Sequence, residues 1–305
     1  MGYFLLTLLF FSSMEVVSKP LMGMADPFTL TLHRFFIGFL VLLSIKAAPS
    51  YGGIGSLLRV PFRRLLYLAF LGLLNTSFSM SCLQLAVLNG TASQTALIFC
   101  SNPLFVFLIG GALQRESRNL RRWAGILLGL VGIGIVLFSN GFSPKRGDLF
   151  ALFAALSFAL YILLSKRALK GSSPLEVNVV SFFFGLLGIL LFLLFTGRPL
   201  LLPPDLFLKP KPLAAFLYLG IGVSGLAYLT FIKTLERFSA LSSSVIFFLK
   251  PAFASLFAVV FLSERVGPIF GIGLFLLLWG SLLVIRSDGA FLLFLEKVKG
   301  SWGEE

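Results

Sequence analysis

Long apolar runs, separated by short polar clusters, dominate the pattern of the chain. The hydrocarbon core of a bilayer is about 30 Å thick and takes about 20 apolar residues of helix to cross. Cutting the chain at its polar, Gly and Pro clusters leaves ten such runs. They span residues 3–17, 28–45, 65–88, 92–113, 123–138, 149–164, 177–195, 213–232, 240–262 and 269–285. The pattern predicts an all-α integral membrane protein with ten transmembrane helices.

The composition excludes a soluble domain. Of 305 residues, 58% are hydrophobic and only 12% are charged, whereas a soluble chain carries about 25% charged residues. Disorder, a coiled coil and a disulfide-stapled secreted domain are excluded on the same grounds. Both cysteines, Cys82 and Cys100, lie within apolar runs, and we expect them to be small buried hydrophobic residues.

The net charge of +13 carries information about topology. The Lys and Arg residues fall between apolar runs rather than on one aromatic-rich face, so no nucleic acid is expected as a partner. With the N-terminus in the cytoplasm, the inner segments hold sixteen Lys and Arg residues and the outer segments eight. The positive-inside rule therefore predicts a multi-pass protein of the cell (inner) membrane with both termini cytoplasmic.

An internal repeat becomes visible when the chain is compared with itself at a shift of 147 to 148 residues. Pro27 then meets Pro174, Pro103 meets Pro251, Gly132 meets Gly280 and Glu116 meets Glu264. Each half holds five spans, an odd number, so equivalent positions face opposite sides of the bilayer. We expect two inverted five-helix repeats, at residues 1–140 and 147–287, followed by a cytoplasmic tail at 288–305. Such repeats are an architecture of secondary transporters.

Specific residues connect this repeat to a known family. They are Asn102-Pro103-Leu104-Phe105 with Glu116, the equivalent Lys250-Pro251-Ala252-Phe253 with Ser263-Glu264-Arg265, and Gly147-Asp148 before the sixth span. Through these residues the chain resembles the EamA-type transporters of the drug/metabolite transporter (DMT) superfamily. The resemblance extends over nearly the whole chain. The resemblance implies a ten-helix bundle that moves small metabolites, such as amino acids or their derivatives, often outward, through a central cavity. Glu116 and Glu264, beside Arg115 and Arg265 at the membrane edges, either neutralise loop charge or act as the gates that the resemblance implies. The chain departs from the family at Phe158, where Trp is common, and at Lys250, where an acidic or apolar residue is common.

A charged side chain inside a span costs about 2.5–3.5 kcal/mol on insertion scales and so needs a partner or a task. Lys250 lies about 15 Å deep in the ninth span, and its repeat equivalent is Asn102. Either Lys250 contacts a substrate carboxylate or phosphate with Asn102 as a hydrogen-bonding partner, or it forms a structural ion pair with Glu15. The proline after each residue predicts a helix break. A cation at this depth favours an anionic or zwitterionic solute.

Three further ionisable residues lie within the first two spans. Glu15 either pairs with Lys19, four residues on, or serves as a proton site. His33, the only histidine, is either a hydrogen-bonded structural group or a proton relay. Its neighbour Arg34 is expected to snorkel outward or to bind a lipid headgroup.

Polar residues inside other spans complete the candidate site, although each alone also fits helix-to-helix hydrogen bonding. The substrate-binding candidates are Lys250, Asn102, Glu15, Tyr161, Asn178, Gln94, Ser243 and Tyr228, and the proton-coupling candidates are Glu15 and His33.

One histidine and two apolar-embedded cysteines supply neither a catalytic constellation nor a metal site, so no enzyme, metal or cofactor is expected. The sequence predicts a secondary transporter that exports a small amino acid-like, zwitterionic or anionic solute by alternating access. Multidrug or cation efflux by the same fold, a channel and a lipid-handling protein are the alternatives. The expected partners are a small-molecule substrate, the lipid bilayer, and protons or a counter-substrate, for a monomer or a homodimer.

Overall fold

A computed structural model describes residues 2–114, 120–137, 145–244 and 246–286. Helices make up the regular structure of the described residues. The first half contains α1 (Gly2–Ser18), η1 (Lys19–Leu21), α2 (Pro27–Ala47), η2 (Pro49–Tyr51), η3 (Ile54–Arg59), α3 (Phe62–Gly72), η4 (Leu73–Ser79), α4 (Met80–Asn89), α5 (Ala92–Phe99), α6 (Asn102–Gln114) and α7 (Leu120–Leu137). The second half contains α8 (Arg146–Ala168), α9 (Pro174–Thr196), α10 (Pro204–Leu208), α11 (Pro210–Leu217), η5 (Tyr218–Ala227), α12 (Tyr228–Arg237), α13 (Ala240–Ser244), α14 (Ile246–Leu262) and α15 (Pro268–Arg286). Glu116 and the predicted tail at 288–305 lie outside the described residues.

Seven of the described helices are long and apolar enough to cross a membrane. They cover Gly2–Leu21, Pro27–Ala47, Phe62–Asn89, Ala92–Gly110, Arg146–Ala168, Pro174–Thr196 and Pro210–Arg237. Three shorter apolar helices, Trp123–Val136, Ile246–Leu262 and Pro268–Gly280, coincide with the predicted fifth, ninth and tenth spans. The all-α fold is confirmed, and the count of ten spans stays a prediction.

Local sequence signals fix the ends of several long helices. Asp26 caps α2 by accepting hydrogen bonds from the backbone N–H groups of Phe28 and Thr29, and Pro27 occupies the first helical position. Ser173 caps α9 in the same way through the Glu176 N–H. Such caps satisfy backbone donors that have no partner within the helix.

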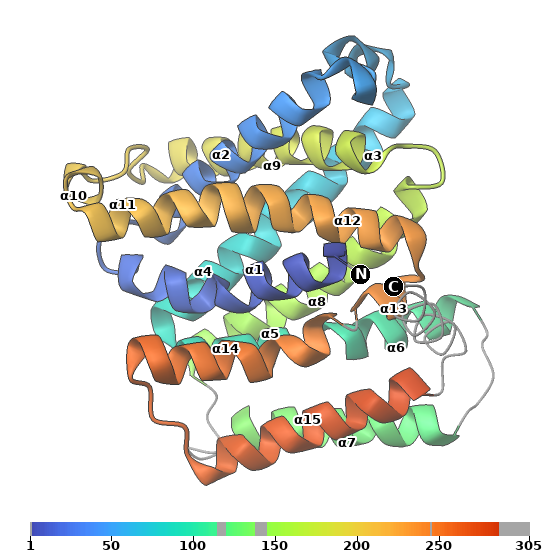
Figure 1. The fold of residues 1–305 in the computed structure, drawn as a ribbon, viewed down its shortest axis with the longest axis vertical. Helices are drawn as coiled ribbons and strands as arrows, with labels where there is room; N and C mark the ends of the chain where they lie inside the picture. The colour runs from blue at the N-terminus through green and yellow to red at the C-terminus, as the bar shows by residue number, and fades with distance from the viewer. Residues whose placement is uncertain (1, 115–119, 138–144, 245, 287–305) are drawn as a thin grey trace, which may run out of the picture.

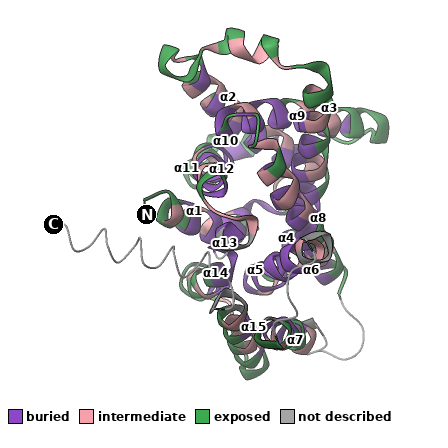
Figure 2. Ribbon diagram, turned by 90° about the vertical axis from the view of Figure 1, so that its right-hand side faces the viewer, coloured by how far each residue is buried: buried purple, intermediate pink, exposed green. Residues whose placement is uncertain are grey.

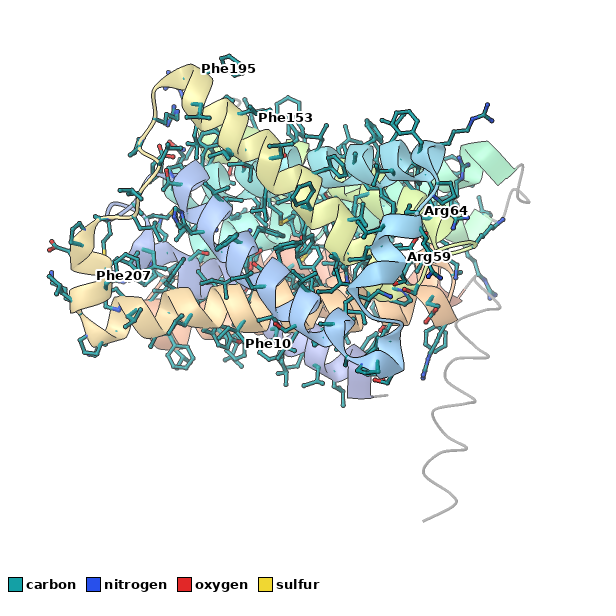
Figure 3. All side chains as sticks on the ribbon, turned by 90° about the horizontal axis from the view of Figure 1, so that it is seen from above. Phe10, Arg59, Arg64, Phe153, Phe195 and Phe207 are labelled. Atoms are coloured by element: carbon teal, nitrogen blue, oxygen red, sulfur yellow. The ribbon has the colours of Figure 1, made fainter. Side chains whose placement is uncertain are left out.

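The helices run side by side in a bundle with two faces at their ends (Figure 1). We call the right-hand end in Figure 1, which carries the N-terminus, the N-terminal face, and the left-hand end, which carries α10, the opposite face. Viewed from the N-terminal face, the buried residues gather inside the bundle and the exposed ones lie on its periphery (Figure 2). Phe10, Phe153 and Phe195 project from the sides of the bundle, whereas Arg59 and Arg64 lie toward the N-terminal face (Figure 3).

Helices α7 and α15 form a pair at one edge of the bundle (Figure 1). A Cβ atom on Gly132 would lie 2.6 Å from the Gly273 carbonyl oxygen, and one on Gly280 would clash with the Gly125 carbonyl oxygen. Small residues let helix backbones approach closely, and these glycines do so between α7 and α15.

Two spans contain a π-helical segment at equivalent positions of the repeat, η4 after α3 and η5 before α12. Periodicity alone predicts a continuous helix at both places. A π-helical turn leaves the regular hydrogen-bonding ladder and rotates the side chains that follow it, and such segments are frequent at functional sites.

The helix break predicted at the repeated proline is present in one half of the chain. The fourth span is interrupted at Cys100 and Ser101, between α5 and α6, just before Asn102-Pro103. In the second half, Pro251 lies inside α14. The predicted break at Pro251 is therefore wrong.

Candidate functional site

A buried ion pair lies at the centre of the bundle. The Lys250 Nζ atom of α14 donates a hydrogen bond of 2.5 Å to Oε1 of Glu15 in α1. The two side chains are 2% and 0% exposed. Of the two sequence-based alternatives for Glu15, the partner is Lys250 rather than Lys19. Burying two charges costs free energy, and the short distance between Nζ and Oε1 provides the attraction that offsets this cost.

Arg34 is a third charged residue at the centre of the bundle, and its predicted role at the lipid surface is wrong. Its side chain is fully buried, and its Cζ atom lies 4.7 Å from the centre of the Phe35 ring. Nε and Nη2 have no hydrogen-bond partner. A desolvated guanidinium with unused donors is costly unless a further group satisfies it, so Arg34 is prepared to bind an acceptor.

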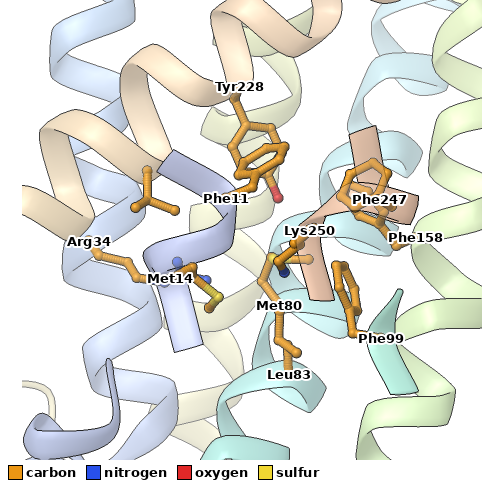
Figure 4. Close-up of a pocket in the computed structure, with 11 residues that line it drawn as sticks. Phe11, Met14, Arg34, Met80, Leu83, Phe99, Phe158, Tyr228, Phe247 and Lys250 are labelled. Atoms are coloured by element: carbon orange, nitrogen blue, oxygen red, sulfur yellow. The ribbon is translucent and has the colours of Figure 1, made fainter. Parts of the chain in front are cut away.

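Arg34 and Lys250 line the same small cavity (Figure 4). Its other walls are Phe11, Met14, Met80, Leu83, Phe99, Phe158, Val223, Tyr228 and Phe247. The cavity volume is about 20 Å³, which is room for about one water molecule. With Glu15 included, the three charged side chains carry a net charge of +1 in an otherwise apolar and aromatic enclosure.

Aromatic rings form a continuous layer around the ion pair. Phe247 stacks on Phe11 with ring centres 5.8 Å apart, and its edge meets Phe158 at 5.3 Å. The Lys250 ammonium lies 4.6 Å from the centre of the Phe99 ring. A cation over an aromatic face gains electrostatic stabilisation, and the gain is larger when water is excluded. Phe158 is also a wall of the cavity.

Tyr228 is held in the cavity wall by two polar contacts. Its hydroxyl donates to Oδ1 of Asn75 at 3.2 Å, and its backbone carbonyl accepts from Nδ2 of Asn178 at 3.3 Å. Asn75 lies in η4, and Tyr228 directly follows η5. The two π-helical segments therefore orient the polar side of the cavity.

The remaining predicted residues do not line this cavity. Asn102 donates to the Phe99 carbonyl at 2.9 Å, Tyr161 packs on Phe158 and Tyr228, and Ser243 is buried in α13. Gln94 donates to Asp148 at 2.8 Å. His33 contacts the Thr29 carbonyl and faces a pocket between α2 and α9 that includes the exposed Phe36 and Phe183.

Hydrogen bonds from Lys19 and to Glu264 join the turn between α4 and α5 to the helices beside it at the opposite face of the bundle. Lys19 donates to the carbonyl oxygens of Val87 and Gly90 at 2.8 and 2.5 Å, at the end of α4. Glu264, which follows α14, accepts from the backbone N–H groups of Ala92 and Ser93 at 2.7 and 3.1 Å. Cations favour helix C-termini and anions favour N-termini, so these contacts fix the turn between α4 and α5.

The N-terminal face has an equivalent contact in the second repeat. Lys166, the repeat equivalent of Lys19, donates to the carbonyl oxygens of Leu235 and Glu236 at 2.7 and 3.1 Å, near the end of α12. We call the contacts of Lys19 and Lys166 the two lysine clamps. The two clamps lie on opposite faces of the bundle, one at the end of α4 and one at the end of α12.

Sequence reasoning missed Arg34 and Asn75 as parts of the site. A signal was available in α2, where Pro27, Thr31, Arg34 and Gly38 lie on one stripe and are all buried. A stripe of small and polar residues in a membrane helix faces other helices rather than lipid. Among the described residues, the structure brings no three His, Cys, Asp or Glu side chains together as a metal site.

The bundle with a buried charged cavity belongs to the class of polytopic membrane transporters, and comparison with known proteins gives the family. The EamA-like transporter family matches the chain twice, over residues 1–138 and 145–286. The chain is a member of this family, as the residues around the two prolines indicated.

Several relatives are named as transporters. An uncharacterized transporter of Clostridium kluyveri is 31% identical over 296 residues, covering 94% of this chain and 93% of that protein. An S-adenosylmethionine uptake transporter of Rickettsia bellii is 27% identical over 180 residues, 58% of each chain. A chloroplastic WAT1-related protein of Arabidopsis thaliana is 24% identical over 84% of this chain and 62% of its own length. A solved crystal structure has a TM-score of 0.69 at 22% identity, over 92% of this chain and 94% of that chain, which shows the common fold.

Proposed function

We propose that this transporter moves a small amino acid-like solute, zwitterionic or anionic, out of the cell by alternating access. The two repeats, at residues 1–140 and 147–287, form inverted halves of a ten-helix bundle in the cell membrane. The substrate binds between them, in the cavity that Arg34 and Lys250 line and beside Glu15, the ion-pair partner of Lys250.

The unsatisfied guanidinium of Arg34 carries this proposal. Its Nε and Nη2 atoms are buried without a partner, and guanidinium groups bind carboxylates through two parallel hydrogen bonds. A substrate carboxylate at Arg34 neutralises the net positive charge of the cavity. A substrate ammonium finds its counter-charge at Glu15, whose Oε2 atom has no hydrogen-bond partner. The amino acid end of S-adenosylmethionine, the substrate in the name of one relative, has this pair of charges.

The size of the cavity supports a closed intermediate of the transport cycle. About 20 Å³ is too small for an amino acid, so binding must separate the side chains around the cavity. Release of one lysine clamp at a time opens one face while the other stays closed. That sequence of events is what alternating access requires.

Proton coupling through Glu15 stays part of this proposal. Glu15 lies in the cavity region, where a substrate that competes for Lys250 would free its carboxylate to take a proton. His33 lies between α2 and α9 at the surface of the bundle, and nothing in its contacts connects it with the ion pair.

The test is a thermal-shift screen of the purified protein against amino acids, small organic acids, phosphorylated sugars, nucleotide sugars and lipophilic cations. A ligand at a hundredfold excess over its Kd stabilises the folded state by about 2.7 kcal/mol. We expect a shift with a zwitterion or an anion. The shift should vanish in Arg34→Gln and persist in Arg198→Gln, because Arg198 is 43% exposed and pairs with Asp26 at the opposite face.

Flux into proteoliposomes separates binding from transport. The proposed solute should show saturable flux that Arg34→Gln abolishes. Shifts with lipophilic cations alone would instead identify a drug-efflux pocket formed by Glu15 and the aromatic rings. Linear, non-saturating flux would indicate a channel.

A further inference from the structure

A second, larger hollow lies on the side of the bundle. It is about 690 Å³ in volume and runs between α11 with η5 on one side and α14 on the other, with α1 as its floor. Leu9, Ser13 and Val17 of α1, Ala214 and Ala215 of α11, and Phe261 of α14 are among its walls. We call it the α1 groove. Helices α11, α1 and α14 lie next to one another in Figure 1, and the groove lies in the half of the bundle toward the opposite face.

The α1 groove exists because small residues replace large ones at repeat-equivalent positions. At the shifts of 147 and 148 residues, Ser13 corresponds to Leu160, Ala214 to Leu66 and Ala215 to Tyr67. In the other half, the Tyr67 hydroxyl donates to the Leu164 carbonyl at 3.0 Å and joins α3 to α8. Ala215 has no side chain that could make the equivalent contact to α1. The smaller side chains at these positions thus leave room between α1 and α11.

The walls of the groove offer an apolar ligand a surface without free polar groups. The Ser13 hydroxyl donates to the Phe10 carbonyl at 3.0 Å and shares a 2.7 Å hydrogen bond with the Tyr218 hydroxyl. Leu9 is 50% exposed and Phe261 72% exposed along its edges. An apolar, partly open groove on the lipid-facing side of a membrane protein fits a hydrocarbon chain.

Two basic residues lie near the end of the groove that is closer to the opposite face. Lys211 lies three residues before Ala214, and Arg265 lies three residues after Leu262, a further wall residue; both cations are exposed. Glu264, the acidic neighbour of Arg265, has both carboxylate oxygens engaged by the N-terminus of α5. The charge at this rim is therefore complementary to a phosphate at headgroup depth.

We propose that the α1 groove binds an anionic phospholipid, with one acyl chain between α11 and α14 and the phosphate near Lys211 and Arg265. The floor helix α1 carries Glu15 and the wall helix α14 carries Lys250, so the bound chain supports the two helices that hold the central ion pair. This site is separate from the central cavity, and its test does not depend on the transported solute.

The experiment measures lipid retained by the purified protein with native mass spectrometry, after exchange into detergent with phosphatidylglycerol or phosphatidylcholine. Phosphatidylglycerol should be retained by the wild type. Ala215→Tyr installs the residue of the equivalent position and should abolish this retention by filling the groove. Leu191→Tyr, a matched control on the exposed surface of α9, should leave it unchanged.

A second pair of variants keeps the test valid if Ala215→Tyr does not fold. Lys211→Gln and Arg265→Gln change exposed residues only, and each should weaken phosphatidylglycerol retention about fivefold. Glycerol phosphate, which lacks acyl chains, should not compete. Competition by glycerol phosphate, equal retention of both lipids, or unchanged retention in Ala215→Tyr would overturn the proposal. A change of oligomeric state in Ala215→Tyr would identify a second copy of the chain as the occupant and would overturn it as well.

Discussion

Three buried charges share one apolar centre, and their environments differ. Lys250 and Glu15 form an ion pair at 2.5 Å through Oε1 of Glu15, whereas Oε2 of Glu15 and two nitrogen atoms of Arg34 have no hydrogen-bond partner. Removing one member of a buried ion pair leaves an uncompensated charge, while removing both avoids that penalty. The first two residues therefore contribute to stability as a unit, and Arg34 remains available for a ligand.

This difference predicts the outcome of a double-mutant cycle. Lys250→Met should destabilise the protein by about 3–5 kcal/mol because Glu15 stays buried without a partner. The double variant Glu15→Gln/Lys250→Met should recover most of that loss in thermal unfolding. Flux should be lost in Lys250→Ala provided that the variant folds. A double variant as unstable as the single one, or normal flux in folded Lys250→Ala, would contradict the assignment.

At the scale of helices, a half-buried lysine binds a helix end at each face of the bundle, and under the proposed mechanism these two contacts stabilise the closed conformation. Lys19 binds the end of α4 and Lys166 binds the region at the end of α12. A hydrogen bond from a charged donor contributes about 1.5–3 kcal/mol. Because the two clamps are related by the repeat, they should act on opposite faces.

Loss of either clamp should open one face only. In a Cys82→Ala/Cys100→Ala background, Val223→Cys places a thiol in the cavity wall. Lys19→Met should raise its labelling by an impermeant thiol reagent about tenfold from the opposite face, and Lys166→Met should do so from the N-terminal face. Lys170→Met, an exposed lysine beside the second clamp, serves as the control. Increased labelling from the same face in both variants would contradict the assignment of one lysine clamp to each face.

Close contact of α7 and α15 makes a second prediction at this scale. Gly280→Val should lower the unfolding free energy by about 1–3 kcal/mol, because its side chain meets the backbone of Gly125. Gly271→Val, in the same helix, meets nothing within 4 Å and should be tolerated. Thermal unfolding of both variants measures the difference in stability. An equal loss of stability in both would show that helix propensity, rather than packing, determines the effect of the substitution.

For the whole molecule, the distribution of Lys and Arg predicts the orientation in the membrane. Arg59 lies toward the N-terminal face and Phe207 near the opposite face (Figure 3), and Lys209 follows Phe207 in the chain. The positive-inside rule places the N-terminal face in the cytoplasm. In intact cells, an impermeant thiol reagent should therefore label Lys209→Cys, in a background without native cysteines, and should label Arg59→Cys only after lysis. The reverse pattern would show that the charge rule fails here.

Much of the candidate site could be predicted from the sequence, because charges in apolar helices stand out. Of the residues that the sequence predicts for the site, Lys250 and Tyr228 line the central cavity and Glu15 pairs with Lys250. Asn102, Gln94 and His33, which are predicted from depth or residue type, make their contacts outside this cavity. Depth along a helix gives the distance from the membrane surface but not the direction of a side chain. That direction depends on helix rotation, which the π-helical segments η4 and η5 change.

The sequence by itself determined the all-helical membrane fold, the family and the internal repeat, because hydrophobic run length and repeated Pro and Gly positions are properties of the chain. The tertiary structure decided which partner each buried charge has. Glu15 could pair with Lys19 four residues away or with Lys250 across the bundle, and packing of α1 against α14 selected Lys250. The tertiary structure also directs the Arg34 side chain inward and leaves the α1 groove open. The direction of Arg34 and the shape of the groove both depend on how helices distant in the chain face one another.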